Sequence, residues 1–112
     1  MTHAVPPSLR SQLREVDDAT FDAEVASAPL VLVKFTAAWC PPCRALQPTL
    51  EAVAKDRPGL QVLSVDVDEQ QATAQRFGVR ALPTLLVFRG GQVAGQVVGN
   101  QSRAAVERLL GG

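Results

Sequence analysis

Cys40 and Cys43 are the only two cysteines of this 112-residue chain, and they lie three positions apart. Two thiols at this spacing can close a small disulfide ring. They follow an apolar run at residues 30–35 and precede a stretch with helical periodicity. A helix that begins at Cys40 would direct its unpaired N–H groups and the positive end of its dipole at that sulfur, which favours thiolate over thiol. A Cys40 thiolate can attack a disulfide and Cys43 can resolve the mixed disulfide, so the segment predicts a two-electron redox centre.

A zinc site is the alternative for this pair of cysteines. Structural zinc takes about four nitrogen or sulfur ligands, and the only other candidate of that kind is His3. We therefore favour redox chemistry and expect no metal or other bound cofactor beyond the Cys40–Cys43 disulfide itself. A cysteine–histidine hydrolase is disfavoured because the chain has no second histidine. We expect Cys40 to be the exposed attacking thiol and Cys43, nearly one helical turn further in, to be the buried resolving thiol.

The composition is that of an ordinary soluble domain, with 46% apolar and 20% charged residues. Eleven basic and eleven acidic residues cancel, so no bulk attraction to nucleic acid or to an anionic membrane is expected. The apolar runs are too short to cross a bilayer, and residues 1–7 lack the apolar core of a signal peptide. We expect a monomer in the reducing cytoplasm, where a close cysteine pair is more often catalytic or metal-binding than structural.

Hydrophobic patterns and turn residues predict nine elements in the order βαβαβαββα. The predicted strands cover residues 13–16, 30–35, 60–67, 84–88 and 92–98. The predicted helices cover residues 18–27, 40–57, 70–77 and 102–110. Gly90 and Gly91 are a strong hairpin signal between the last two strands, and Ser102 can cap the last helix. We expect residues 1–12 to form a flexible N-terminal arm and residues 13–112 to form one domain.

Three motifs together resemble the thioredoxin family: Trp-Cys-x-x-Cys at residues 39–43, Ala-Leu-Pro-Thr at 81–84, and Val-Gly at 98–99. The resemblance runs from about residue 13 to residue 110. It implies an α/β protein with the thioredoxin fold, in which four helices flank a five-stranded mixed sheet. It also implies reduction of protein disulfides through the Cys40/Cys43 dithiol, with electrons supplied by an NADPH-dependent thioredoxin reductase.

The resemblance further implies where a substrate binds. The proline that matches Pro83 is cis in the family and faces the disulfide, which turns the backbone of Leu82 outward to pair with an extended substrate segment. Val98 and Gly99 would form the opposite wall of an apolar groove, where glycine lets a partner backbone approach closely. The indole beside the nucleophile is expected to be partly exposed at this groove and not in the core. The predicted substrate-binding residues are Trp39, Ala81, Leu82, Pro83, Val98 and Gly99.

The sequence departs from the family pattern at several positions that would tune the redox reaction. Pro41, followed by Pro42, stands where the first spacer residue is usually Gly; its ring fixes φ and removes one N–H, and the net effect on the thiols stays open. Lys34 stands where the family commonly has a buried acid, and Ser64 stands where that acid's partner lysine would be. We expect Lys34 either to pair with Asp66 or to extend its ammonium to solvent, with equal weight.

Two rival functions remain open at this point. One is a more oxidising disulfide oxidase or isomerase, since Pro41 and Lys34 both alter the site, and the reduction potential would discriminate it. The other is a non-catalytic binding subunit with a thioredoxin-like fold, which would keep its effect after both cysteines are replaced by serine. We favour a thiol–disulfide oxidoreductase that acts on disulfide-containing proteins.

Overall fold

The apolar run at residues 30–33 begins the central strand of the sheet. The structure, a computed structural model, describes residues 13–111, and its five strands lie in the order β1-β3-β2-β4-β5. β2 (Leu30–Thr36) is parallel to β3 on one side and antiparallel to β4 on the other. A strand covered on both faces is expected to be mostly apolar, and Lys34 and Thr36 are the only polar residues of β2.

The order of the elements along the chain is the predicted βαβαβαββα, and the predicted fold class is confirmed. The other strands are β1 (Leu13–Glu15), β3 (Gln61–Asp66), β4 (Thr84–Arg89) and β5 (Gln92–Val98). The helices are α1 (Phe21–Val25), α2 (Pro41–Asp56), α3 (Gln71–Arg76) and α4 (Arg103–Leu109). Each predicted element is present, and their ends differ from the predicted bounds by up to a few residues.

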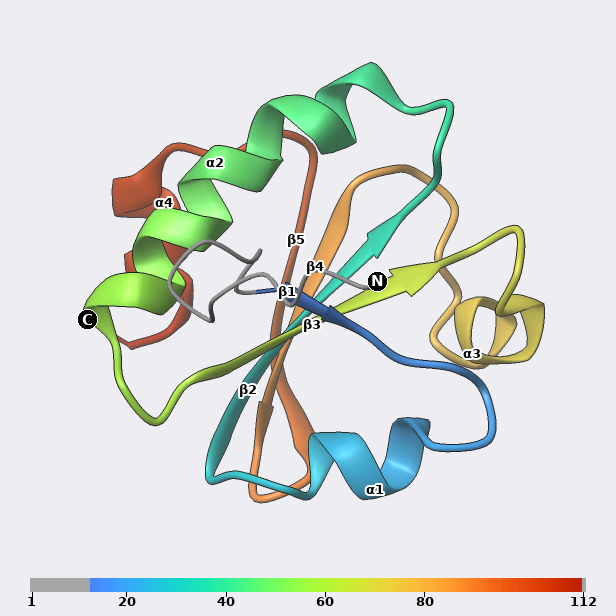
Figure 1. Cartoon of the computed structure of the whole chain (residues 1–112), viewed down its shortest axis with the longest axis horizontal. Coiled ribbons are helices and arrows are strands. Elements are labelled where there is room, and N and C mark those ends of the chain that lie inside the picture. The colour runs from blue at the N-terminus through green and yellow to red at the C-terminus, as the bar shows by residue number, and fades with distance from the viewer. Residues whose placement is uncertain (1–12, 112) are drawn as a thin grey trace, which may run out of the picture.

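The helices cover the two faces of the sheet in pairs (Figure 1). Alternate residues of β2 serve the two faces, because successive strand side chains point to opposite sides. Val31, Val33 and Phe35 join the core cluster beneath α1 and α3, whereas Leu32 joins the cluster formed with α2 and α4. Lys34 therefore lies on the α2 side of the sheet, in a position that would otherwise be apolar.

All four phenylalanines gather on the α1 and α3 face. Phe77 has its ring centroid 5.4 Å from that of Phe21, 5.6 Å from that of Phe88 and 6.2 Å from that of Phe35. The tilted and edge-on arrangements are those that aromatic quadrupoles favour. This cluster fixes the two short helices, which are too short to be stable without tertiary packing.

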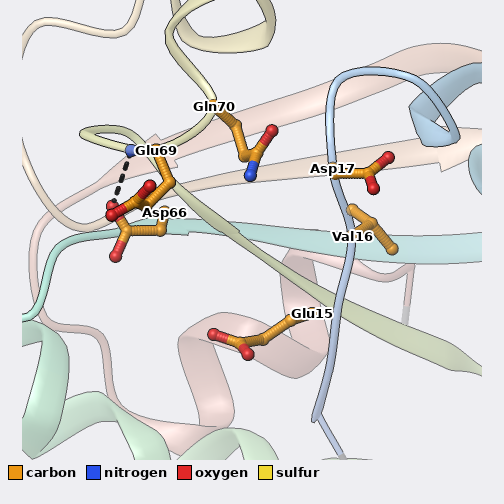
Figure 2. Close-up of a pocket in the computed structure, with 6 residues that line it drawn as sticks. All are labelled: Glu15, Val16, Asp17, Asp66, Glu69 and Gln70. Carbon is orange, nitrogen blue, oxygen red and sulfur yellow. Dashed lines mark hydrogen bonds between the residues drawn. The ribbon is translucent and has the colours of Figure 1, made fainter.

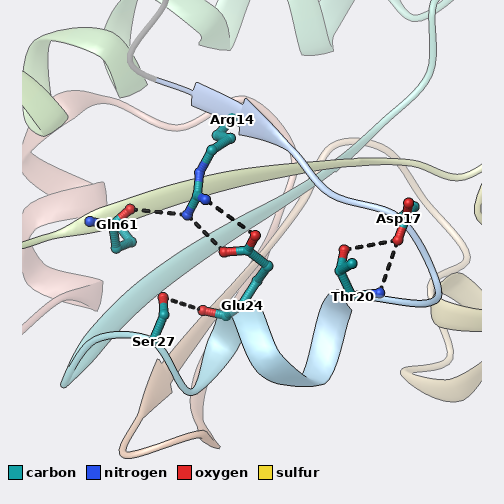
Figure 3. A network of polar contacts seen from close by, with 6 residues as sticks. All are labelled: Arg14, Asp17, Thr20, Glu24, Ser27 and Gln61. Carbon is teal, nitrogen blue, oxygen red and sulfur yellow. Dashed lines mark hydrogen bonds and ion pairs between the residues drawn. The ribbon is translucent and has the colours of Figure 1, made fainter.

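Polar contacts attach the edge strand β1 to its neighbours (Figure 3). The Arg14 guanidinium pairs with Glu24 of α1 at 2.9 Å and donates to Gln61 of β3 at 3.2 Å. The residue before α1, Thr20, does not cap the helix with its side chain. Instead, Asp17 Oδ1 accepts hydrogen bonds from both the backbone N–H and the hydroxyl of Thr20, which fixes the turn into α1.

The β4–β5 hairpin and the last helix follow their predicted signals. Gly90 and Gly91 both have positive φ, 59° and 81°, as the tight turn requires. Ser102 accepts the backbone N–H of Ala105 and caps α4. The predicted arm at residues 1–12 lies outside the described residues. Within residues 13–111, no helix combines the length and the hydrophobicity needed to cross a membrane.

Candidate active site

The two cysteines are joined by a disulfide at the point where β2 gives way to α2. Their Cα atoms are 5.3 Å apart, and Cys40 is the N-cap of α2 with an extended backbone. The central strand therefore delivers Cys40 to one end of the sheet, and the first turn of α2 places Cys43 beside it. This position is the one predicted from the sequence.

The first turn of α2 points a single backbone donor at the sulfur of Cys40. Pro41 and Pro42 occupy the first two helical positions and have no N–H. The first available donor is therefore the N–H of Cys43, which donates to Cys40 Sγ at 3.2 Å. Together with the helix dipole, this hydrogen bond stabilises negative charge on Cys40 once the disulfide is opened.

Both cysteines are buried in the disulfide form, with exposed fractions of 2% for Cys40 and 1% for Cys43. The expectation that Cys40 would be exposed is therefore wrong for this form. Both sulfur-bearing residues pack against Ala37, and half-buried Val67 and Leu82 cover the cluster. Sequence spacing could not reveal this burial, because Val67 and Leu82 come from other parts of the chain.

The segment before β4 and the end of β5 meet beside this cluster. The Leu82–Pro83 peptide bond is cis, as the family resemblance implied. The backbone N–H of Gly99 donates to the carbonyl of Pro83 at 2.8 Å, and Val98 is the register partner of Thr84. Leu82 contacts the cysteine cluster directly. The structure thus brings the predicted residues of both strands together near the disulfide.

Trp39 lies on the surface and not in the core, as predicted. Its exposed fraction is 64%, and its indole N–H donates to Asp68 Oδ2 at 2.8 Å. Val98 is 47% exposed and Ala81 is also exposed, whereas Leu82 is half-buried. Gly99 is half-buried and Pro83 is buried. Exposed apolar side chains therefore accompany a disulfide that is itself nearly covered. We call the six predicted substrate-binding residues the apolar rim: Trp39, Ala81, Leu82, Pro83, Val98 and Gly99.

Within residues 13–111, no group of three or more His, Cys, Asp or Glu side chains is arranged to hold a metal ion. The same residues contain no free cysteine, because Cys40 and Cys43 form the disulfide. The chemistry that this arrangement can perform is reversible exchange of the Cys40–Cys43 disulfide with other thiols.

Comparison with known proteins agrees with this chemistry. The thioredoxin family model matches residues 12–111. A thioredoxin from Streptomyces clavuligerus is 41% identical over 97 residues, which covers 86% of this chain and 91% of that protein. The chain belongs to the thioredoxin family. It is a thiol–disulfide oxidoreductase with protein-disulfide reductase activity.

Solved structures of thioredoxins share the fold of this family member. A mutant thioredoxin from Halobacterium salinarum NRC-1 superposes with a TM-score of 0.82 at 36% identity, covering 88% of this chain and 87% of that one. The oxidised form of mitochondrial thioredoxin 3 from Saccharomyces cerevisiae gives a TM-score of 0.83 at 26% identity, covering 90% and 97%. The five-stranded mixed sheet with four helices is thus the thioredoxin fold.

Lys34, which departs from the thioredoxin pattern, takes neither of its two expected positions. Its side chain is buried, with 4% exposure, and its ammonium donates to Gln47 Oε1 of α2 at 2.6 Å. Gln47 Nε2 in turn donates to Glu51 Oε2 at 2.8 Å. The expected pairing with Asp66 and the expected extension to solvent are both wrong. Burial lowers the pKa of Lys34 below its ordinary value of 10.5, and the negative charge of Glu51 partly opposes this.

Asp66 has other partners near the end of β3. Its Oδ1 accepts the backbone N–H of Asp68 at 2.9 Å. It also accepts the backbone N–H of Glu69 at 3.2 Å, which Figure 2 shows. The Asp66 carboxylate thus binds the backbone of its own turn, while Lys34 binds Gln47 of α2. Ser64, in contrast, is the register partner of Lys34, as the family resemblance implied.

Two pockets adjoin this region of the thioredoxin fold. One of about 320 Å³ is acidic and lined by Glu15, Val16, Asp17, Asp66, Glu69 and Gln70 (Figure 2). The other, of about 420 Å³, is lined by Lys34, Gln47, Ala37 and Ala38 among other residues.

Gln47 and Glu51 were not among the residues predicted from the sequence. Their spacing of four and eight residues after Cys43 was the available signal, because it places all three on one face of α2.

Proposed function

We propose that Cys40 is the attacking thiol and Cys43 the resolving thiol of a protein-disulfide reductase. In the reduced protein, the Cys40 thiolate attacks one sulfur of a substrate disulfide, and the other substrate sulfur leaves as a thiolate. Cys43 then attacks Cys40 Sγ, which releases the second substrate sulfur and re-forms the Cys40–Cys43 disulfide. The substrate gains two electrons and the dithiol loses two. The hydrogen bond from the Cys43 N–H to Cys40 Sγ carries this assignment, because it favours the thiolate at Cys40.

The partners in this proposal are disulfide-containing proteins on one side and an NADPH-dependent thioredoxin reductase on the other. The reductase returns electrons to the Cys40–Cys43 disulfide, so the protein acts as an electron carrier in the redox homeostasis of the cell. A reductant of this kind works in a reducing compartment, and we place it in the cytoplasm as a monomer. We further propose that residues 13–112 act as one domain, separate from residues 1–12.

The apolar rim is the proposed substrate-binding surface. An extended segment of the substrate would pair with the backbone at Leu82, as an added strand does, while its apolar side chains contact Trp39 and Val98. The exposure of these two side chains beside a buried disulfide supports the assignment. Gly99, with φ of +95° and no side chain, leaves room for the approaching backbone.

Four residues are proposed to tune the dithiol. Pro41 and Pro42 leave the Cys43 N–H as the first donor of α2, so they concentrate the helix-start interaction on one hydrogen bond. Lys34 brings a positive charge to the α2 side of the sheet. Asp66 lies at the boundary of both pockets and adds a negative charge near the same region.

Reduction of insulin disulfides, coupled to NADPH oxidation through a thioredoxin reductase, tests the proposed function. The wild-type protein should support continuous NADPH oxidation, whereas Cys40→Ser should give none because the attacking sulfur is absent. Lys55→Met is a suitable control, because Lys55 is exposed in the last turn of α2. Reduction of insulin at an equal rate by wild type and Cys40→Ser would overturn the proposal.

A further inference from the structure

The two thiol-exchange steps described above take neither a proton nor an electron from the buried Lys34, which Gln47 of α2 binds one helical turn beyond Cys43. We infer that Gln47 and Glu51 hold the Lys34 ammonium on the α2 side of the sheet near Cys43, where its charge stabilises the Cys43 thiolate during resolution. The inference rests on the proposed role of Cys43 as the resolving thiol. In this inference Lys34 acts on Cys43 through its charge, and Gln47 and Glu51 hold the Lys34 side chain in position.

Geometry places the ammonium near Cys43. Lys34 Nζ lies 2.6 Å from Gln47 Oε1. Gln47 follows Cys43 by four residues, so the two side chains are neighbours on one helix face, one turn apart. Ala37, which follows Lys34 by three residues, packs against both cysteines and lines the same pocket as Lys34. Ala37 thus adjoins both the two cysteines and the pocket that contains Lys34.

The charge at Lys34 is not cancelled by a direct ion pair. Among residues 13–111, the ion pairs involve arginines only, and the ammonium meets an uncharged amide oxygen. The carboxylate of Glu51 lies behind that amide and is hydrogen-bonded to its nitrogen. The amide of Gln47 therefore lies between the ammonium and the carboxylate of Glu51.

The other charged groups that face Lys34 come from β1 and β3. Glu15 and Asp66 line the same pocket, together with the neutral hydroxyls of Thr36 and Ser64. Asp66 is bound to backbone N–H groups of its own turn. Burial lowers the pKa of Lys34, and the negative charge of Glu51 partly opposes this shift.

The Lys34 charge acts on the resolution step, in which Cys43 attacks the mixed disulfide. Before resolution, the Cys43 thiol loses its proton to solvent water, and the resulting thiolate attacks Cys40 Sγ. The bond between Cys40 and the substrate breaks, and the substrate sulfur leaves with the electron pair and takes a proton from solvent. Lys34 keeps its own proton throughout and contributes only its field. Because the field favours the reduced, thiolate-containing form, it also makes the Cys40–Cys43 disulfide easier to reduce.

The test titrates Cys43 by the ultraviolet absorbance of its thiolate, in a Cys40→Ser background where no other thiol is present. Lys34→Met should raise the pKa of Cys43, so that the thiolate fraction near neutral pH falls by about two- to tenfold. Gln47→Met should change it in the same direction by less, since the ammonium loses its acceptor. Lys34→Arg keeps the charge and should stay close to the parent, as should the exposed control Lys55→Met.

The outcomes separate the inference from the proposed function. Equal titration of the parent, Lys34→Met and Gln47→Met would overturn the inference, even if the wild-type protein reduces insulin. A change shared by Lys34→Met and Lys34→Arg would also overturn it, because it would show packing and not charge. If Lys34→Met does not fold, the half-buried Gln47→Met decides alone. Failure of the wild-type protein to reduce insulin would instead remove the function on which the inference rests.

Discussion

The backbone N–H of Gly99 donates to the carbonyl of Pro83 across 2.8 Å, which joins the end of β5 to the segment that precedes β4 beside the disulfide. Gly99 has a φ of +95°, a conformation that other residues rarely adopt. The hydrogen bond that joins these two segments of the apolar rim therefore comes from a glycine. A substitution at Gly99 is expected to affect both the stability of the fold and the binding of substrate.

Gly99→Ala should lower the free energy of unfolding by about 1–2 kcal/mol, because the new side chain is strained at positive φ. It should also slow reduction of protein substrates, since a Cβ is added to the proposed binding surface. Gly59→Ala is the matched control, because Gly59 has a φ of +96° and a Cβ added there would meet no atom within 4 Å. Chemical denaturation and insulin reduction should show equal loss of stability but slower reduction only for Gly99→Ala.

Val98→Asp should lower the rate of protein-disulfide reduction by about tenfold or more, while the rate of reduction of a small disulfide should stay nearly unchanged. A charge placed at a desolvated contact is poorly tolerated in a complex, and a small disulfide does not need that contact. Val93→Asp provides the control, because Val93 lies on the same strand with 50% exposure against 47% for Val98. Steady-state kinetics with insulin and with a small aliphatic disulfide measure the difference. Equal effects of the two variants would show that the apolar rim does not bind substrate.

Because Lys34 is buried, the free energy of unfolding should depend on pH in the alkaline range. The pKa of Lys34 is lowered in the folded state, so the unfolded chain binds more protons between that lowered value and 10.5. The free energy of unfolding should therefore rise with pH across this window, and below it the unfavourable burial of the charge is complete. Lys34→Met should be more stable than wild type at neutral pH and should lack this rise. Denaturation at a series of pH values measures it; parallel pH curves for both proteins would contradict the expectation.

The helices and strands, and the position of the redox site between β2 and α2, could be predicted from the sequence. A mostly apolar run predicted β2, and the pair Gly90 and Gly91 predicted the hairpin, because both signals are local in the chain. Cys40 and Cys43 needed only their spacing and the helix that follows. These features depend on interactions between residues that are close in sequence.

The environment of individual side chains could not be predicted in the same way. Lys34 binds Gln47 because α2 lies across that part of the sheet, and the strand pattern does not specify which turn of the helix crosses it. The burial of Cys40 depends on Val67 and Leu82, which the fold brings from other segments. Such contacts are set by tertiary packing, which propensity and periodicity do not describe.

The order of the two thiols is the central claim, and the trapping of a mixed disulfide by Cys43→Ser tests it most directly. Without the resolving thiol, Cys40 should remain joined to the substrate after attack. Peptide mass mapping of the adduct with a protein disulfide should find the substrate on Cys40, and Cys40→Ser should give little adduct under the same conditions. The reverse result, with a stable adduct on Cys43 of the Cys40→Ser variant and none on Cys40, would contradict the account.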